Sequence, residues 1–347
     1  MQDNKSEHLC WVDAAKGIGI LAIMLGHIQY INWMTPFKIV IFFVVSGYLY
    51  AQKQELLTAR KALSLTKKLL IPYFTFGLIF LLIELMVSVV QRKPILDSFK
   101  VLLSMVFSMR GLSTLWFLPT FLGGTLLALQ IRKYNAIAQI GWSGIVILLS
   151  CIYSSQQSEG NYIAHSFGDY VLLTVLKMCA ASVFIIGGGY IQNTVLLRKT
   201  SRREMCLKNG IAVCVLIISV VCSQFYFGSD FNNLFLSRLP LVYFCTAFLQ
   251  SLAIMILVND TPIGNSKILS FFGRNSLFFM ITHHGFKFCR IITTITKMAL
   301  PSGPIKVLVD FSILLIIESI LFLLWQFVMS KAIRSSRKSK VTYRSIV

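Results

Sequence analysis

A lysine and a histidine in the first apolar stretch of the chain have the side chains needed to bind an anion and to move a proton. Residues 11–27 read WVDAAKGIGILAIMLGH, with Lys16 and His27 eleven positions apart. In an α-helix of about 100° and 1.5 Å per residue this step is three turns, which puts both side chains on one face roughly 16 Å apart. An imidazole at membrane depth is costly unless it faces a polar interior, so we expect His27 to be functional. A histidine satisfied inside the packed core is the alternative.

A second group of titratable side chains occurs late in the chain, in GRNSLFFMITHHGFKFCR. His283, Lys287 and Arg290 follow one another at spacings of four and three residues. In one continuous helix they would form a stripe lining a cavity, which would suit a phosphorylated or carboxylate-bearing ligand. Alternatively, Lys287 and Arg290 end the helix and reach lipid headgroups, which leaves only a histidine inside. Glu84 or Glu318 could supply the counter-charge.

These residue types fit acyl transfer from a phosphate-bearing donor. A neutral imidazole can take a proton from an acceptor hydroxyl as that hydroxyl attacks a thioester, and this general-base role needs no metal. Basic side chains near helix ends could hold the donor's phosphates. The sequence has no H-E-x-x-H motif and no close His/Asp cluster, so we expect no metal site.

The composition identifies the class of protein that must position these groups. Of the 347 residues, 56% are hydrophobic and 13% are charged, and the mean hydropathy is +0.73. A chain of this kind cannot cover a soluble surface with polar groups, so we predict an all-α, polytopic membrane bundle. The eight cysteines form no C-x-x-C motif and are interpreted as small apolar residues.

Apolar runs predict about ten transmembrane helices, since about 20 apolar residues cross the hydrocarbon once. Residues 37–50 follow the first span after a short turn, and residues 101–107 are too short to span, so we expect that stretch to be interfacial or re-entrant. Pro72 is expected near the start of the third span. The predicted spans are residues 11–27, 37–50, 72–90, 115–131, 136–153, 170–191, 210–226, 234–258, 268–295 and 304–329.

The net charge of +20 is concentrated in short segments between the apolar runs, as expected for residues that orient membrane helices. We therefore expect no nucleic-acid partner, and we place both termini in the cytoplasm. The exception is a basic group, Arg92, Lys93, Lys100 and Arg110, which this topology places outside. Either these residues bind an anionic acceptor or headgroup, or the span count is wrong near residue 100.

We predict one membrane-embedded domain, residues 1–330, followed by a basic cytoplasmic tail, residues 331–347. A run of glycines, residues 187–189, lies inside an apolar span and is expected to permit close helix packing. A transporter or flippase for an anionic or polyprenyl-linked glycan is the competing function. A non-catalytic membrane partner would explain the bundle but not the paired titratable residues.

Five sequence blocks, in order, resemble the membrane-bound acyltransferase 3 family, and within it the branch similar to fucose 4-O-acetylase. The opening block contains Lys16 and His27, and the second, FKIVIFFVVSGYLY, is phenylalanine-rich and ends in S-G-Y. A single apolar block would be weak evidence, whereas five in order are a strong signal. The other three blocks are KKLLIPYF at residues 67–74, LWFLPTF at residues 115–121 and FFGRNSLFFMITHH at residues 271–284.

The resemblance implies transfer of an acyl group, commonly acetyl from acetyl-coenzyme A (acetyl-CoA), to hydroxyls of surface carbohydrates or their lipid-linked precursors. It also implies a multi-pass protein of a bacterial plasma membrane. His27 would be the catalytic histidine, acting as a base or accepting the acyl group itself, with Lys16 and Asp13 in support. Many relatives have a histidine where this chain has Lys38, which bears on the acceptor. The residues expected to bind donor or substrate are Lys38, Lys67, Lys68, Trp116, Asn275, Ser276 and His283.

Overall fold

The computed structural model describes residues 10–28, 35–157, 165–194, 196–198, 201–225, 228–236 and 239–344. In these ranges the chain is helical throughout, apart from short turns and one isolated bridge between Asp230 and Phe235. The α-helices are α1 (Cys10–Ile28), α2 (Thr35–Gln52), α3 (Ala59–Val90), α4 (Ile95–Phe107), α5 (Phe117–Ile131), α6 (Ala136–Ser155), α7 (Phe167–Ile191), α8 (Arg202–Val221), α9 (Pro240–Asp260), α10 (Lys267–Arg274), α11 (Ser276–Gly285), α12 (Phe288–Thr296) and α13 (Pro304–Arg344).

The predicted all-α membrane bundle is confirmed. Eight helices of the described chain are long and apolar enough to span a membrane, and α2 is a shorter apolar helix. In α1, α5, α7 and α9 more than half of the apolar window is buried inside the protein, against 28% or less in α3, α6, α8 and α13. The first four are therefore core helices, whereas the other four turn apolar side chains outward, as contact with lipid requires.

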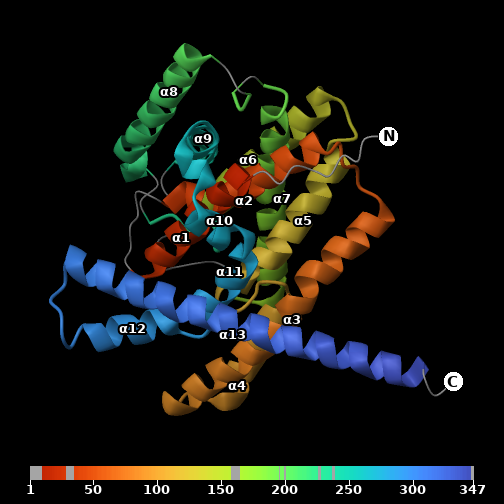
Figure 1. Ribbon diagram of the computed structural model, residues 1–347, viewed down its shortest axis with the longest axis vertical. Coiled ribbons are helices and arrows are strands. Elements are labelled where there is room, and N and C mark those ends of the chain that lie inside the picture. The colour runs from red at the N-terminus through yellow and green to blue at the C-terminus, as the bar shows by residue number, and fades with distance from the viewer. Residues whose placement is uncertain are drawn as a thin grey trace.

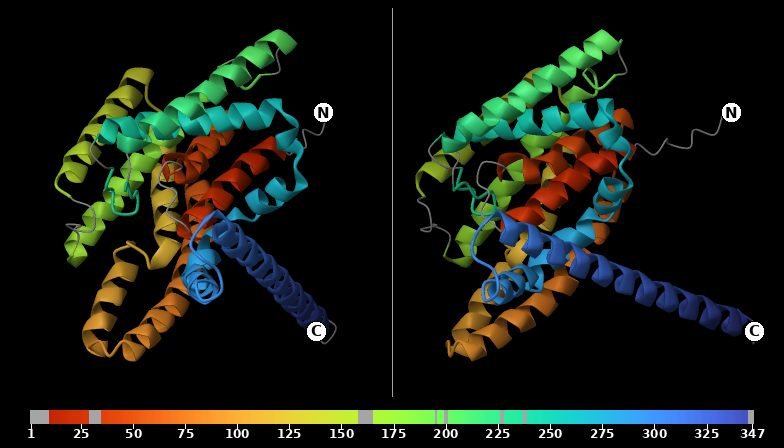
Figure 2. Two further views of the ribbon diagram at one scale, coloured as in Figure 1. Left: turned by 90° about the vertical axis from the view of Figure 1, so that its left-hand side faces the viewer. Right: turned by 60° about the vertical axis from the view of Figure 1, so that its left-hand side comes forward.

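The outer helices extend from the central bundle in different directions. Figure 1 shows α13 running alongside α12 and continuing past α3 to the C-terminus. In Figure 2, α3 and α4 form a hairpin that projects from the rest of the molecule. Helix α4 has only 13 residues, so it is too short to span, as expected for this region.

Glycines bring the core helices into close contact. A methyl group at Gly47 on α2 would lie 1.9 Å from the Ile185 carbonyl oxygen, and one at Gly188 on α7 would lie 2.1 Å from the Val44 carbonyl oxygen. These distances leave no room for any side chain. The prediction that residues 187–189 permit close helix packing is therefore confirmed.

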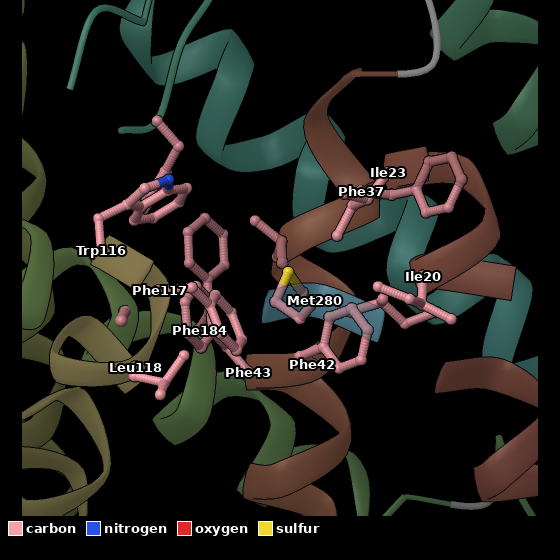
Figure 3. Packing of buried hydrophobic residues seen from close by; sticks show 14 of the residues in the cluster. Ile20, Ile23, Phe37, Phe42, Phe43, Trp116, Phe117, Leu118, Phe184 and Met280 are labelled. Carbon is pink, nitrogen blue, oxygen red and sulfur yellow. The ribbon is translucent and has the colours of Figure 1, made fainter. Parts of the chain in front are cut away.

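Aromatic side chains fill the space where α2, α5 and α7 meet (Figure 3). The Phe43 ring stacks on Phe117 with 5.6 Å between centroids, and it also contacts Phe231, with 6.0 Å between centroids. Phe231 in turn lies 6.1 Å from Trp116. The segment from 228 to 236 is thus anchored in the core by a buried aromatic side chain, which fixes the polar residues beside it.

Several helix boundaries differ from the prediction, and α8, for example, begins at Arg202 and not at residue 210. Helix α3 begins at Ala59, capped by Thr58, so Pro72 lies inside a helix and not near its start. Helix α9 begins at Pro240, because a tight turn closed by the Asp230–Phe235 bridge precedes it. Helix α13 is continuous to Arg344, so no loop separates the predicted tail from the last span.

The predicted ninth span is wrong as a single helix. Residues 268–295 form α10, α11 and α12, with breaks at Asn275 and Lys287. Lys287 has a left-handed backbone with φ of 62°, which a continuous α-helix cannot contain. His283, Lys287 and Arg290 therefore do not form one helical stripe.

Candidate active site

A polar cavity of about 350 Å³ lies where α1, α2, α9 and α11 meet the turns at residues 108–116 and 228–236. Its wall combines titratable side chains with apolar ones, and a large cluster of buried apolar residues surrounds it. A polar cavity inside an apolar bundle is a candidate reaction site. The titratable residues that line it are His27, Lys38, Arg110, Asp230, Tyr243 and His284.

His27 contributes its imidazole from the last turn of α1. Because α1 is one continuous helix, Lys16, Ile20, Ile23 and His27 follow a single stripe. Ile20 and Ile23 are buried, with 0% and 3% exposure, whereas the His27 side chain is exposed to the cavity. The structure thus places His27 on an accessible polar wall and not in packed core.

Two further imidazoles from α11 surround His27. The His27 ring centroid lies 5.1 Å from that of His283 and 4.5 Å from that of His284. His283 is completely buried, and His284 reaches the cavity wall. Three histidines from two helices therefore lie close together, although His27 is far from the other two in the sequence.

The orientation of His283 is fixed by its own helix. Its Nδ1 lies 2.5 Å from the carbonyl oxygen of Phe279, which can only accept a hydrogen bond. The neutral ring therefore carries its hydrogen on Nδ1, which leaves Nε2 with a lone pair. Among the described residues, no atom hydrogen-bonds to this buried Nε2. A buried acceptor of this kind can take a hydrogen bond from a neighbouring imidazole.

The turn before α5 holds α11 against the cavity. The Ser113 hydroxyl lies 2.8 Å from Nδ1 of His284. The neighbouring Thr114 hydroxyl donates a hydrogen bond to the Ile281 carbonyl at 3.3 Å. The position of the histidine pair thus depends on a short 3-10 helix, residues Ser113–Trp116, as well as on α11 itself.

Lys38 on α2 lies beside the last turn of α1, which carries His27. A methyl group built on Gly26 would lie 2.8 Å from Lys38 Nζ, so the ammonium group lies directly against the backbone beside His27. Lys38 and Trp116 both line the cavity, as expected for residues that contact substrate. The small size of Gly26 is what allows the lysine to reach this position.

Two polar residues outside the predicted set, Arg110 and Asn232, line the cavity, and Lys177 is buried beside Asn232. Arg110 is buried and donates hydrogen bonds to the side-chain oxygens of Asn232 and Asn233. Lys177 on α7 is completely buried, and its Nζ lies 3.4 Å from the same Asn232 oxygen and 5.1 Å from the Trp116 ring centroid. The sequence indicated Arg110 and Lys177 only as charged residues in or near apolar segments.

The similarity to known proteins is specific at the level of the family. Residues 10–330 match the acyltransferase 3 family, described as an acyltransferase domain. The chain belongs to this family. It is therefore an acyltransferase that transfers groups other than aminoacyl groups, which decides against the transporter alternative. No curated protein and no solved structure is significantly similar to it.

In this acyltransferase, Asp13 and Lys16 do not line the cavity. Asp13 is buried and binds Lys16 Nζ at 2.7 Å and Arg274 Nε at 3.1 Å, so it ties the start of α1 to α10. Ile20 and Ile23 are buried between Lys16 and His27 along that stripe. A role of Lys16 and Asp13 in donor binding stays a prediction. In the structure, the contacts of Asp13 hold α1 against α10.

The other expected site residues of the acyltransferase also lie away from the cavity lining. Lys67 and Lys68 are exposed on α3, and Asn275 donates to the Phe271 carbonyl at the break between α10 and α11. Ser276 is the first residue of α11. For these residues a direct contact with substrate stays a prediction.

The charges near the end of α11 are arranged differently from the expected stripe. Lys287 forms an ion pair with Glu84 on α3, so the counter-charge considered for this region is confirmed as Glu84. Arg290 is exposed on α12. Glu318 accepts a hydrogen bond of 2.5 Å from Thr282, next to His283. Of the predicted stripe, only His283 belongs to the histidine group.

Within the described chain, no three His, Cys, Asp or Glu side chains are grouped in a way that could hold a metal ion. The histidine group of the acyltransferase consists of imidazoles whose contacts are with one another, with Ser113 and with the Phe279 carbonyl. Such an arrangement can accept, hold and pass a proton.

Proposed function

We propose that this acyltransferase is an O-acetyltransferase that moves an acetyl group from acetyl-CoA to a hydroxyl of a cell-surface carbohydrate or its lipid-linked precursor. The observation that carries the proposal is the position of His27, which is exposed to a polar cavity with two further imidazoles beside it. A base inside a membrane bundle needs such a cavity, because the acceptor hydroxyl must reach it.

In the proposed reaction, His27 takes the proton of the acceptor hydroxyl as the oxygen attacks the thioester carbonyl. The resulting tetrahedral intermediate collapses, the C–S bond breaks, and the coenzyme A thiolate leaves and takes a proton from the imidazolium. The charge that develops on the carbonyl oxygen needs a positive group nearby, and the Lys38 ammonium against Gly26 supports this role.

The buried His283 supports the choice of His27 as the base. Its lone pair on Nε2 can accept a hydrogen bond from the His27 ring, which favours the tautomer that presents a free nitrogen to the acceptor. His284 and Ser113 would hold the other side of the ring in place. A transient acyl-histidine, in which His27 itself accepts the acetyl group first, is the alternative route with the same residues.

The proposal includes the surroundings of the reaction. The protein would lie in a bacterial plasma membrane, with both termini in the cytoplasm, and the donor would approach the α1 end that carries Asp13 and Lys16. Lys67 and Lys68, exposed on α3, would contact the donor's phosphates.

Topology mapping with reporters fused to the two termini tests the proposed cytoplasmic location of both termini. A reporter that is active only outside the cell would contradict this orientation.

The test is mass spectrometry of surface glycans from cells with and without the protein. The expected result is a mass difference of one acetyl group, together with transfer of label from radiolabelled acetyl-CoA to glycan in isolated membranes. A matched strain carrying the variant His27→Gln controls for indirect effects on glycan synthesis. Identical glycan masses in all strains and no transferred label would contradict the proposal.

A further inference from the structure

Ser113 brings a hydroxyl and a histidine partner together at the cavity wall. Ser113 and His284 both line the cavity, and the serine Oγ lies 2.8 Å from Nδ1 of the histidine. This is a hydrogen-bond distance between a hydroxyl and an imidazole. A serine hydroxyl becomes a nucleophile when an adjacent base takes its proton, and an imidazole with its lone pair on Nδ1 is such a base.

The backbone of Ser113 has a conformation that a serine rarely adopts. Its φ is 54°, and Met109 and Gly111, earlier in the same turn, also have positive φ values of 60° and 76°. A residue other than glycine in the left-handed region costs free energy, and such residues are concentrated at functional sites. Glycine would adopt the same φ without that cost. A serine at this position therefore indicates that its hydroxyl is used.

Neighbouring contacts hold Ser113 in place. The Thr114 hydroxyl donates to the Ile281 carbonyl at 3.3 Å, which ties the turn to α11. A methyl group at Gly111 would lie 2.5 Å from the backbone nitrogen of Trp116, so the turn packs directly against the 3-10 helix that carries Ser113. A nucleophile on such a fixed turn keeps one direction of attack.

We propose that Ser113 is the first acceptor of the acetyl group, so that the protein forms an acetyl-serine intermediate with His284 as the base. The inference rests on the proposed function and divides its transfer into two steps. In the first step, Nδ1 of His284 takes the hydroxyl proton as Ser113 Oγ attacks the thioester carbonyl. The C–S bond then breaks, and the coenzyme A thiolate leaves with the proton from the His284 imidazolium.

The second step uses His27 as the base. The acceptor hydroxyl attacks the carbonyl carbon of the Ser113 ester, and His27 takes its proton. The bond between that carbon and Ser113 Oγ breaks, and Oγ recovers the proton that His27 took. The rings of His27 and His284 lie side by side, with 4.5 Å between centroids, so one cavity contains the bases for both steps. His27 keeps its part in the proposed reaction, but the acceptor attacks an ester in place of the thioester.

The size of the cavity favours two steps. A volume of about 350 Å³ is near the lower end of ligand sites. In a single step, the thioester with its pantetheine arm and the acceptor sugar would have to share this space. With the acetyl group on Ser113, the coenzyme A thiol leaves before the sugar enters, so the two substrates use the cavity in turn.

The first test traps the intermediate. Full-length protein in detergent is incubated with radiolabelled acetyl-CoA without acceptor, and the labelled peptide is identified by mass spectrometry after digestion. The expected result is an acetyl group on Ser113 that is stable to neutral hydroxylamine, as an oxygen ester is. In membranes that contain the glycan, His27→Gln should keep the label on Ser113, because the second step lacks its base. Label on a histidine, or no label on Ser113, would overturn the proposal.

Variants of Ser113 separate chemistry from structure. Ser113→Gly removes the hydroxyl and relieves the positive φ, so its Tm should equal or exceed that of wild type, while transfer to glycan falls by about 100-fold or more. Ser113→Cys keeps a nucleophile and should carry the acetyl group as a thioester, which neutral hydroxylamine releases. The control Ser312→Ala removes an exposed hydroxyl on α13 and should keep both label and transfer.

Exchange of label between coenzyme A and acetyl-CoA separates this inference from the proposed function. An acetyl-serine forms and reverses without acceptor, so wild type should exchange label and Ser113→Gly should not. Glycan labelling by Ser113→Gly at the wild-type rate would overturn the intermediate and leave the proposed function intact. An acetyl group on Ser113 in a protein that labels no glycan would contradict the proposed function but not the intermediate.

Discussion

The His27 and His283 imidazoles lie with their ring centroids 5.1 Å apart, one exposed to the cavity and the other completely buried behind it. His283 is held by its hydrogen bond to the Phe279 carbonyl, so its ring cannot turn without losing that bond. The buried imidazole is thus a fixed partner for the accessible one. We propose that one ring meets substrate and the other positions it, and the predictions below test this division of roles.

Replacing His283 should lower the rate of transfer without weakening donor binding. We expect His283→Gln to reduce kcat by up to about 100-fold, because a misplaced base costs rate rather than affinity, while the KM for acetyl-CoA stays unchanged. Steady-state kinetics in membranes measure both quantities. His165→Gln, a change in an exposed loop, is the control. Equal losses in both variants, or a raised KM with normal kcat, would contradict a positioning role.

The contact between α1 and α10 should be sensitive to one methyl group. A methyl group at Gly273 would lie 1.7 Å from the Asp13 carbonyl oxygen, so Gly273→Ala must push the two helices apart. We expect a loss of about 1–3 kcal/mol in the free energy of unfolding, measured by denaturant titration in mixed micelles. In α6, Gly141 has nothing within 4 Å, so Gly141→Ala should be neutral or slightly stabilising. Similar effects of the two changes would refute the close contact.

The ion pair of Lys287 with Glu84 should appear as a coupling between α3 and the end of α11. Both side chains are one-quarter exposed, so the interaction is weakened by solvent, and we expect about 0.5–1 kcal/mol. A double-mutant cycle with Glu84→Gln and Lys287→Met measures it directly through the free energy of unfolding. If the two single changes simply add, the pair contributes nothing and Lys287 is available for another partner.

Periodicity in the sequence was sufficient to predict the first helix and the face on which Lys16 and His27 lie. The helix α1 is uninterrupted, so the spacing of Lys16 and His27 placed both on one stripe correctly. The same reasoning failed for residues 268–295, since the chain turns at Lys287, two residues after Gly285, with which α11 ends. Lys287 adopts the left-handed region and pairs with Glu84, a contact between distant segments that the spacing of the charged residues does not indicate.

The cluster of Arg110, Lys177 and Asn232 could not be derived from the sequence, because its contacts join residues that are far apart in the sequence. Arg110, Lys177 and Asn232 come from three distant segments, and Phe231 anchors the turn that carries Asn232 in the aromatic core. Arg110 is one of the basic residues that do not fit the charge pattern of the predicted topology. Its burial in the cavity wall explains why the topology rule did not describe it.

The most direct test of the account is acetyl transfer by His27→Gln, measured with radiolabelled acetyl-CoA in membranes that contain equal amounts of wild-type and variant protein. Loss of a general base should reduce transfer by about 100-fold or more, while the Tm and the binding of acetyl-CoA remain close to wild type. Transfer at the wild-type rate by a folded His27→Gln protein would contradict the central claim that this imidazole performs the chemistry.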